Sequence, residues 1–311
     1  MKIGTFPGFK RENGEVGIRN TILIMYTVNC SRFVAQGICK TARAEGIPAQ
    51  VVGNGSCFDN QIIIHKMLRL IAHGNIGAVL LVGHGCEFIQ AGKLERFAKD
   101  IKKPISVVFD QDHGTTACIE EGTAKVRDLW NTIRTQERED IPISSLKVGL
   151  LASCGAAGYE PEIKNLVGDL ISSGAACVTG GPMPEGFVSA GELQPAQTPV
   201  SPGMWYLNIN QQDKSELGSA STCPTDKAMD LICCACQLVL YPMSKGAVIG
   251  TVVSPVLSIC SDRSIATQFP EEIDCIIPGD KTLKESLLNT VKGALVKAEL
   301  LEISEGNLFA L

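Results

Sequence analysis

Short apolar runs alternate with amphipathic segments four times between residues 21 and 133. The apolar runs cover residues 21–28, 49–53, 78–83 and 105–109, and each is followed by a segment with helical periodicity. Such alternation is typical of parallel strands joined by right-handed helical crossovers, with helices on both faces of the sheet. The sequence therefore predicts an α/β fold.

A second region of similar character follows the charged, proline-broken run at residues 134–146. We place the boundary near residue 145, which gives two α/β domains, 1–145 and 146–311, with parallel or mostly parallel sheets flanked by helices. A chain of 311 residues is long enough for two cores. Residues 180–202 are rich in proline and small residues without periodicity, so we expect an irregular segment there. Residues 281–301 have the pattern of one amphipathic helix.

Composition excludes several classes of protein. The net charge of -5 and the dispersed basic residues argue against a nucleic-acid partner. The sequence shows neither a signal peptide nor an apolar run of membrane-spanning length, which predicts no membrane association and a cytoplasmic location. Thirteen cysteines, many in apolar segments, favour a reducing compartment. Since paired C-x-x-C motifs are absent, a closed zinc site is disfavoured, and an iron–sulfur cluster has no local signature.

Polar residues follow all four apolar runs of the first domain. They are Asn29 and Cys30, then residues 54–57, 84–87 and 110–116. The carboxyl ends of parallel strands share one edge, where open α/β folds bind ligands, so these groups predict a small-molecule site. Arg11 and Arg19 precede the first run and offer guanidinium groups suited to a carboxylate. We expect both arginines to share that crevice.

The segment Gly8 to Ser31, GFKRENGEVGIRNTILIMYTVNCS, resembles the start of the large-subunit (C-terminal) region of the altronate/galactarate dehydratase family. Five later segments resemble further family landmarks in the family's order: LLVGHGCEFIQAGKL, FDQDHGTTACIEEGTAKVRDL, VGLLASCG, LVLYPMSKGAVIG and SEGNLFAL. The resemblance implies a divergent member that acts as a carbon–oxygen hydro-lyase on a sugar acid or related small hydroxy acid. It also implies Fe2+ as the divalent metal, and a separately encoded small subunit in place of the family's small N-terminal domain.

Loss of water from a hydroxy acid needs a carboxylate holder, a base, and an acid or metal for the departing hydroxyl. The candidate substrate-binding residues are Arg11, Arg19, Asn20, Asn29, Cys30, Gln111, Thr116 and Lys245. Asp112 is the preferred base, and His84 and His113 are further catalytic candidates because imidazole is a natural base at a strand end. The candidate metal ligands are Cys57, Cys86, Glu87 and Cys154, since thiolates suit iron.

Departures from the family pattern keep alternatives open. Lys245 stands where typical members have an arginine, and the residues after Cys154 lack the expected polar elements. Family members generally have other residue types at His84 and His113, so neither histidine inherits a role. The chain could instead be a non-catalytic ligand-binding paralogue or a substrate-shifted one, such as the large subunit of a sulfo-lyase. The three cysteines could equally be ordinary strand-end residues.

A nicotinamide dehydrogenase is disfavoured, because no G-x-G-x-x-G motif closes the first strand–helix turn. The expected partners are a small carboxylated substrate and the small subunit. Homo-oligomerisation is left open.

Overall fold

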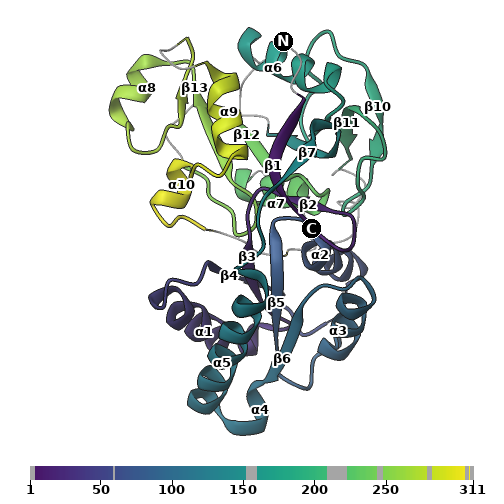
Figure 1. The fold of residues 1–311 in the computed structure, drawn as a ribbon, viewed down its shortest axis with the longest axis vertical. Helices are drawn as coiled ribbons and strands as arrows, with labels where there is room; N and C mark the ends of the chain where they lie inside the picture. Colours follow the sequence, from purple (N-terminus) through teal and green to yellow (C-terminus); the bar gives the residue numbers. More distant parts are fainter. Residues whose placement is uncertain are drawn as a thin grey trace. The chain divides into compact units, whose positions relative to one another are not determined.

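The computed structural model describes residues 4–58, 60–151, 160–208, 223–243, 248–278, 282–304 and 308, and only the backbone of His113. These residues form two compact units (Figure 1). One unit is built on the described residues between 9 and 138 together with Leu308, and the other on residues 4–8 and those between 139 and 304.

Residues 4–8 belong with the later unit because of strand pairing. Strand β1 (Thr5–Lys10) runs antiparallel to β7 (Glu139–Pro142), with Thr5 opposite Pro142 and Gly8 opposite Glu139. At its other end β1 pairs with the short β2 (Val16–Gly17). The domain boundary predicted near residue 145 stays a prediction, and the compact units divide near residues 8 and 138.

The unit of residues 9–138 contains a four-stranded parallel sheet in the order β4-β3-β5-β6. Its strands are β3 (Thr21–Tyr26), β4 (Ala49–Gly53), β5 (Ile76–Gly83) and β6 (Ile105–Phe109). Helices α1 (Arg32–Ala44) and α5 (Thr115–Ile133) pack together on one face, and α2 (Gln61–Ala72) and α3 (Ala91–Asp100) pack together on the other (Figure 1). Every residue of β5 is buried, as expected for a strand covered on both faces.

The other unit contains a seven-stranded parallel sheet in the order β10-β11-β9-β8-β12-β13-β14. Its strands are β8 (Lys147–Leu150), β9 (Ala176–Thr179), β10 (Ser189–Leu193), β11 (Gly203–Leu207), β12 (Leu238–Met243), β13 (Val256–Cys260) and β14 (Cys275–Ile276). Its helices are α6 (Pro161–Ser172), α7 (Pro224–Cys233), α8 (Arg263–Gln268), α9 (Leu283–Val291) and α10 (Lys297–Leu300). The predicted α/β class with parallel sheets is confirmed.

Two segments of this unit differ in detail from the sequence prediction. Residues 180–202 contain one strand, the five-residue β10, which pairs at the sheet edge in parallel with β11, and the rest of the segment has neither helix nor strand. An edge strand is held by backbone hydrogen bonds on one side and needs no apolar run to show in the sequence. The single helix predicted over 281–301 is two helices, because Gly293 has a φ of 114° and right-handed helix cannot continue through it.

No helix in the described part of the chain is long and apolar enough to cross a membrane.

Candidate functional site

The carboxyl ends of the four parallel strands in the unit of residues 9–138 form one edge of the sheet. Tyr26 of β3 lies opposite Gly53 of β4 and Val82 of β5, and Gly83 lies opposite Phe109 of β6. The residues that follow these positions are therefore brought together at this edge, which we call the thiol edge after its three exposed cysteines. The predicted convergence of the four polar clusters is seen in their contacts.

Glu87 is the best-anchored acid of the thiol edge. Its Oε1 accepts hydrogen bonds from Thr27 Oγ1 at 2.6 Å and from the His84 amide at 3.1 Å, and its Oε2 accepts one from the Gly85 amide at 2.6 Å. Gly85 has a φ of 119°, a conformation that glycine adopts without strain. Burial raises the pKa of Glu87, but these hydrogen bonds outweigh it and the net pKa lies below the usual value. Glu87 is a buried carboxylate whose oxygens already have donors.

His84 is held between two side chains. Its Nδ1 lies 2.6 Å from Asp110 Oδ1, and its Nε2 lies 3.0 Å from Gln111 Nε2. If Nδ1–H donates to the carboxylate, Nε2 is left to accept from the Gln111 amide, which fixes the neutral tautomer. A carboxylate behind an imidazole orients the ring. Asp110 belongs to the polar cluster predicted at residues 110–116, but it was assigned no role of its own from the sequence.

Three thiols lie close together at the same edge. Cys30, Cys57 and Cys86 are exposed, and the Cys57 thiol hydrogen-bonds that of Cys30. Desolvation, the neighbouring thiols of Cys30 and Cys86, the hydrogen bond to Cys30, and Glu87 all raise the pKa of Cys57. The Phe88 amide donates to the Cys57 carbonyl at 3.2 Å and joins the loops after β4 and β5. The loops of three strands thus place their thiols side by side.

The predicted metal ligands are Cys57, Cys86, Glu87 and Cys154. Within the described ranges, no group of three or more His, Cys, Asp or Glu side chains is arranged to hold a metal ion. The oxygens of Glu87 are engaged by the chain itself, and Cys154 lies outside the described residues. The described donors therefore do not form the predicted four-ligand set, and iron binding by Cys57, Cys86, Glu87 and Cys154 stays a prediction.

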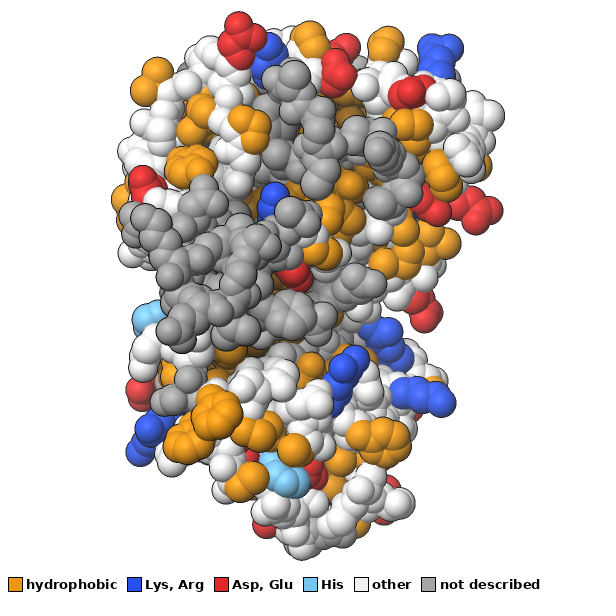
Figure 2. Space-filling model, turned by 180° about the vertical axis from the view of Figure 1, so that it is seen from behind, with side chains coloured by type: hydrophobic (Ala, Val, Ile, Leu, Met, Phe, Trp, Pro, Cys, Tyr) orange, Lys and Arg blue, Asp and Glu red, His pale blue; other side chains and the backbone are white. Residues whose placement is uncertain are grey.

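Exposed aromatic side chains accompany the thiols. Phe33, Phe58 and Phe88 are 70%, 71% and 62% exposed. Phe58 and Phe88 stack, with ring centroids 6.1 Å apart. Figure 2 shows exposed hydrophobic side chains beside a histidine near the lower end of the view. The polar groups of the thiol edge thus have apolar neighbours at the surface.

Arg11, Arg19 and Asn20 lie at the opposite, amino edge of the same sheet. Arg11 Nε donates to the Gly74 carbonyl at 2.8 Å, just before β5, and Asn20 directly precedes β3. A six-residue strand is about 20 Å long, so residues before and after it are far apart. The shared crevice predicted for the arginines and the thiols is therefore wrong. Substrate binding by Arg11, Arg19 and Asn20 stays a prediction.

The other predicted residues are placed as follows. Asn29 and Cys30 lie in the 3-10 turn η1 (Asn29–Ser31), and Gln111 and Asp112 lie in the short helix α4 (Asp110–His113). Thr116 lies in the first turn of α5. Asn29, Gln111, Asp112 and Thr116 are exposed at the thiol edge. Lys245 and the side chain of His113 lie outside the described residues.

Taken together, the fold and the thiol edge define an α/β protein with a cluster of thiol, acidic and imidazole side chains at the carboxyl edge of a parallel sheet. Residues 8–134 match the family described as D-galactarate dehydratase/altronate hydrolase, second domain. This part of the chain is similar to that domain, and the matches to two altronate dehydratases at 31% and 33% identity support a divergent relative of the family. The resemblance inferred from the sequence is confirmed.

Three relatives illustrate the divergence. The altronate dehydratase of Bacillus subtilis (strain 168) is 31% identical over 170 residues, and that of Escherichia coli (strain K12) is 33% identical over 160 residues. The chain spans about a third of the length of these two relatives, 32% of each. The (2R)-sulfolactate sulfo-lyase subunit beta of Chromohalobacter salexigens is 21% identical, over 97% of this chain and 96% of the relative.

Proposed function

We propose that this chain is a carbon–oxygen hydro-lyase that acts on a sugar acid or a related small hydroxy acid, as the large subunit of an enzyme. The observation that carries the proposal is the family match over residues 8–134, because this segment builds the whole thiol edge. The relatives named altronate dehydratase support the reaction class.

The side chains of the thiol edge suit the proton transfers of such a reaction. His84, oriented by Asp110, has its Nε2 directed at the Gln111 amide, which a substrate hydroxyl or carboxylate could displace. We assign removal of the proton next to the substrate carboxylate to His84 or to Asp112, the base preferred from the sequence. General acid–base catalysis of this kind contributes about 10²–10⁴-fold to a rate.

Two accompanying components are part of the proposal. Fe2+ is proposed from the family resemblance and from the affinity of thiolates for iron, although the described residues alone do not complete its ligand set. A separate small subunit is proposed because the full-length relative is itself named a subunit.

The test uses protein purified without oxygen, alone and mixed with a candidate small subunit. Altronate and galactarate are supplied, and the 2-oxo acid formed after loss of water is measured. Asp110→Asn should lower kcat/KM about 100-fold, whereas the exposed Asp100→Asn control should leave it unchanged. Full activity of Asp110→Asn would refute the role given to the His84 pair, and no turnover of either acid by the mixture would refute the hydro-lyase.

A second candidate is the large subunit of a sulfo-lyase. The specific observation in its favour is the alignment with a sulfolactate sulfo-lyase subunit over nearly the whole chain. Release of sulfite from sulfolactate, without turnover of the sugar acids, would select this candidate. Substrate binding without turnover of any acid would select the non-catalytic paralogue.

A further inference from the structure

A second pocket lies at the amino edge of the four-stranded sheet, away from the thiol edge. Its volume is about 290 Å³, and all of its lining residues belong to the unit of residues 9–138. Four lining side chains are cationic and one is acidic; the cations are Lys10, Arg11, Lys102 and Lys103, and the acid is Glu12. Glu12 lies 3.6 Å from Lys102, and both side chains are about 70% exposed. The lining therefore has a positive excess.

Arg11 is a buried member of this lining, only 7% exposed. Its guanidinium donates to the carbonyls of Gly74 and Arg19 and to the side-chain oxygens of Asn20 and Gln136, at 2.6–3.0 Å. All four acceptors are uncharged. Since a guanidinium has five N–H donors, one of them has no partner among the described residues.

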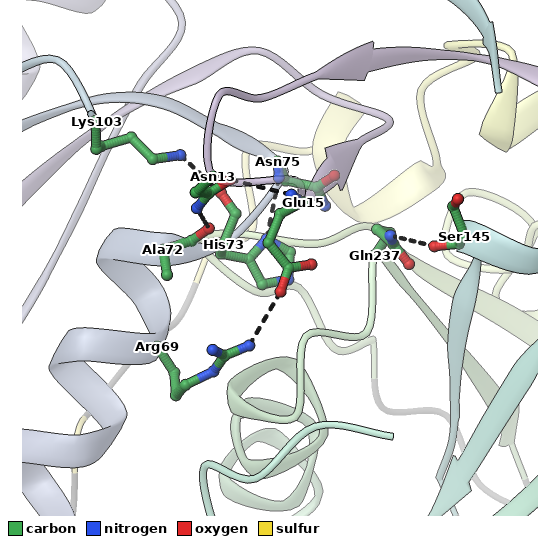
Figure 3. Close-up of polar contacts among 9 residues, drawn as sticks. All are labelled: Asn13, Glu15, Arg69, Ala72, His73, Asn75, Lys103, Ser145 and Gln237. Carbon is green, nitrogen blue, oxygen red and sulfur yellow. Dashed lines mark hydrogen bonds and ion pairs between the residues drawn. The ribbon is translucent and has the colours of Figure 1, made fainter. Parts of the chain in front are cut away.

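Lys103 is the second buried cation, only 5% exposed. Its ammonium donates to the His73 carbonyl at 3.1 Å (Figure 3). It also donates to the Ile76 carbonyl at 2.6 Å, which leaves one of its three donors without a partner in the described part of the chain. Burial, and then the charge of Arg11, hold its pKa well below the usual value, while Glu15 acts in the opposite direction. Glu15 itself pairs with Arg69 at 3.2 Å.

Two buried cations close enough to influence each other thus line one pocket, and neither donates to a carboxylate in the described residues. Buried charges are costly unless they are paired. An oxyanion in the pocket would supply both the missing charge and the missing acceptors, and guanidinium groups bind such oxygens well. We propose that this pocket binds a small oxyanion, a carboxylate or a phosphate, between Arg11 and Lys103.

This binding does not depend on the proposed lyase activity, so it is tested without turnover. Isothermal titration calorimetry measures the affinity of the full chain for sodium tartrate and for sodium phosphate at constant ionic strength, with sodium chloride as the reference. Binding of either oxyanion above the chloride reference supports the proposal, and the stronger one identifies the chemistry of the ligand. Binding of neither at millimolar concentration overturns it.

Four single variants locate the site. Lys103→Gln should weaken binding about tenfold or more, because it removes a charged donor. Lys102→Gln should weaken binding roughly two- to fivefold, and Glu12→Gln should strengthen it by a similar factor, because both are exposed charges at the rim. Lys99→Gln is the control: Lys99 is exposed, pairs with Glu95 at 2.6 Å, and does not line the pocket.

The exposed variants keep the proposal testable if Lys103→Gln does not fold, which circular dichroism would reveal. Opposite changes for Lys102→Gln and Glu12→Gln, with Lys99→Gln unchanged, would support the site. Equal weakening in Lys102→Gln and Lys99→Gln, or weakening in Glu12→Gln, would place the anion elsewhere and overturn the proposal.

Discussion

Replacement of Glu87 by glutamine tests whether this acid stabilises the fold as a carboxylate. The substitution keeps the shape of the side chain but removes its charge. One glutamine oxygen can still accept from Thr27 and from the His84 amide. The new NH2 group then faces the Gly85 amide, which donates to Glu87 at 2.6 Å in the native chain.

The expected cost follows from these contacts. A buried donor left without an acceptor costs about 1–3 kcal/mol, and the two remaining hydrogen bonds lose about 1 kcal/mol each when the acceptor becomes neutral. Because neighbouring contributions are not additive, we expect Glu87→Gln to lower the free energy of unfolding of this unit by about 3 kcal/mol at pH 7.

The sign of the pH dependence is also fixed. The folded pKa of Glu87 lies below its usual value of 4.5. The stabilisation by the ionised carboxylate is therefore fully present above pH 4.5 and is lost as the pH falls through the lower folded pKa. The difference between the native chain and Glu87→Gln should shrink accordingly at acidic pH.

Urea unfolding of metal-free protein in a Trp205→Phe background measures this effect. Trp130 then reports on the unit of residues 9–138, since the chain has only two tryptophans. The control is Glu95→Gln, which removes a helix-surface acid paired with Lys99 and should cost less than about 0.5 kcal/mol. A cost below that of the control at pH 7, or one that does not change with pH, would refute the reasoning.

Three further predictions concern glycine packing, the hydrogen bonds of Arg11 and the exposure of thiols. A Cβ at Gly74 would lie 2.0 Å from the Val16 carbonyl oxygen, so Gly74→Ala should destabilise the fold by several kcal/mol. Gly92 on helix α3 faces open space, so Gly92→Ala should stabilise the fold by about 0.5 kcal/mol. Urea unfolding of the two variants measures both effects. Arg11→Lys should cost about 2–4 kcal/mol by the same assay, because an ammonium cannot reach four separated acceptors. In the native protein, N-ethylmaleimide should label the exposed Cys57 within minutes and leave the buried Cys177 unlabelled, since burial raises the pKa of Cys177 to about 12. Mass spectrometry of the peptides measures the labelling of each cysteine. Equal labelling of the two would contradict the prediction.

Much of the fold could be predicted from the sequence because hydrophobic patterning acts locally. The four apolar runs of the first region became β3 to β6, and the segments between them became helices. The patterning failed where a strand is held mainly by its neighbour, as in β10, and where one backbone angle decides, as at Gly293.

The candidate site was predictable only in part. The groups that follow strands were correctly expected to meet, because parallel strands align their carboxyl ends. Arg11 and Arg19 were wrongly expected to join them, because closeness in the sequence hid the length of β3 between the two edges. Asp110 was placed in the polar cluster 110–116 without a role, because its partner His84 lies 26 residues away and is met only through the pairing of β5 with β6.

The sequence by itself determined the class of fold, the family of residues 8–134 and the edge at which the thiols gather. These follow from periodicity and from the order of motifs, which are properties of the chain read residue by residue. Only the tertiary structure decided that Glu87 is already satisfied by hydrogen bonds and that Arg11 and Lys103 face one pocket. Those facts depend on the packing of residues distant in the chain, and burial then sets what each charged group can bind.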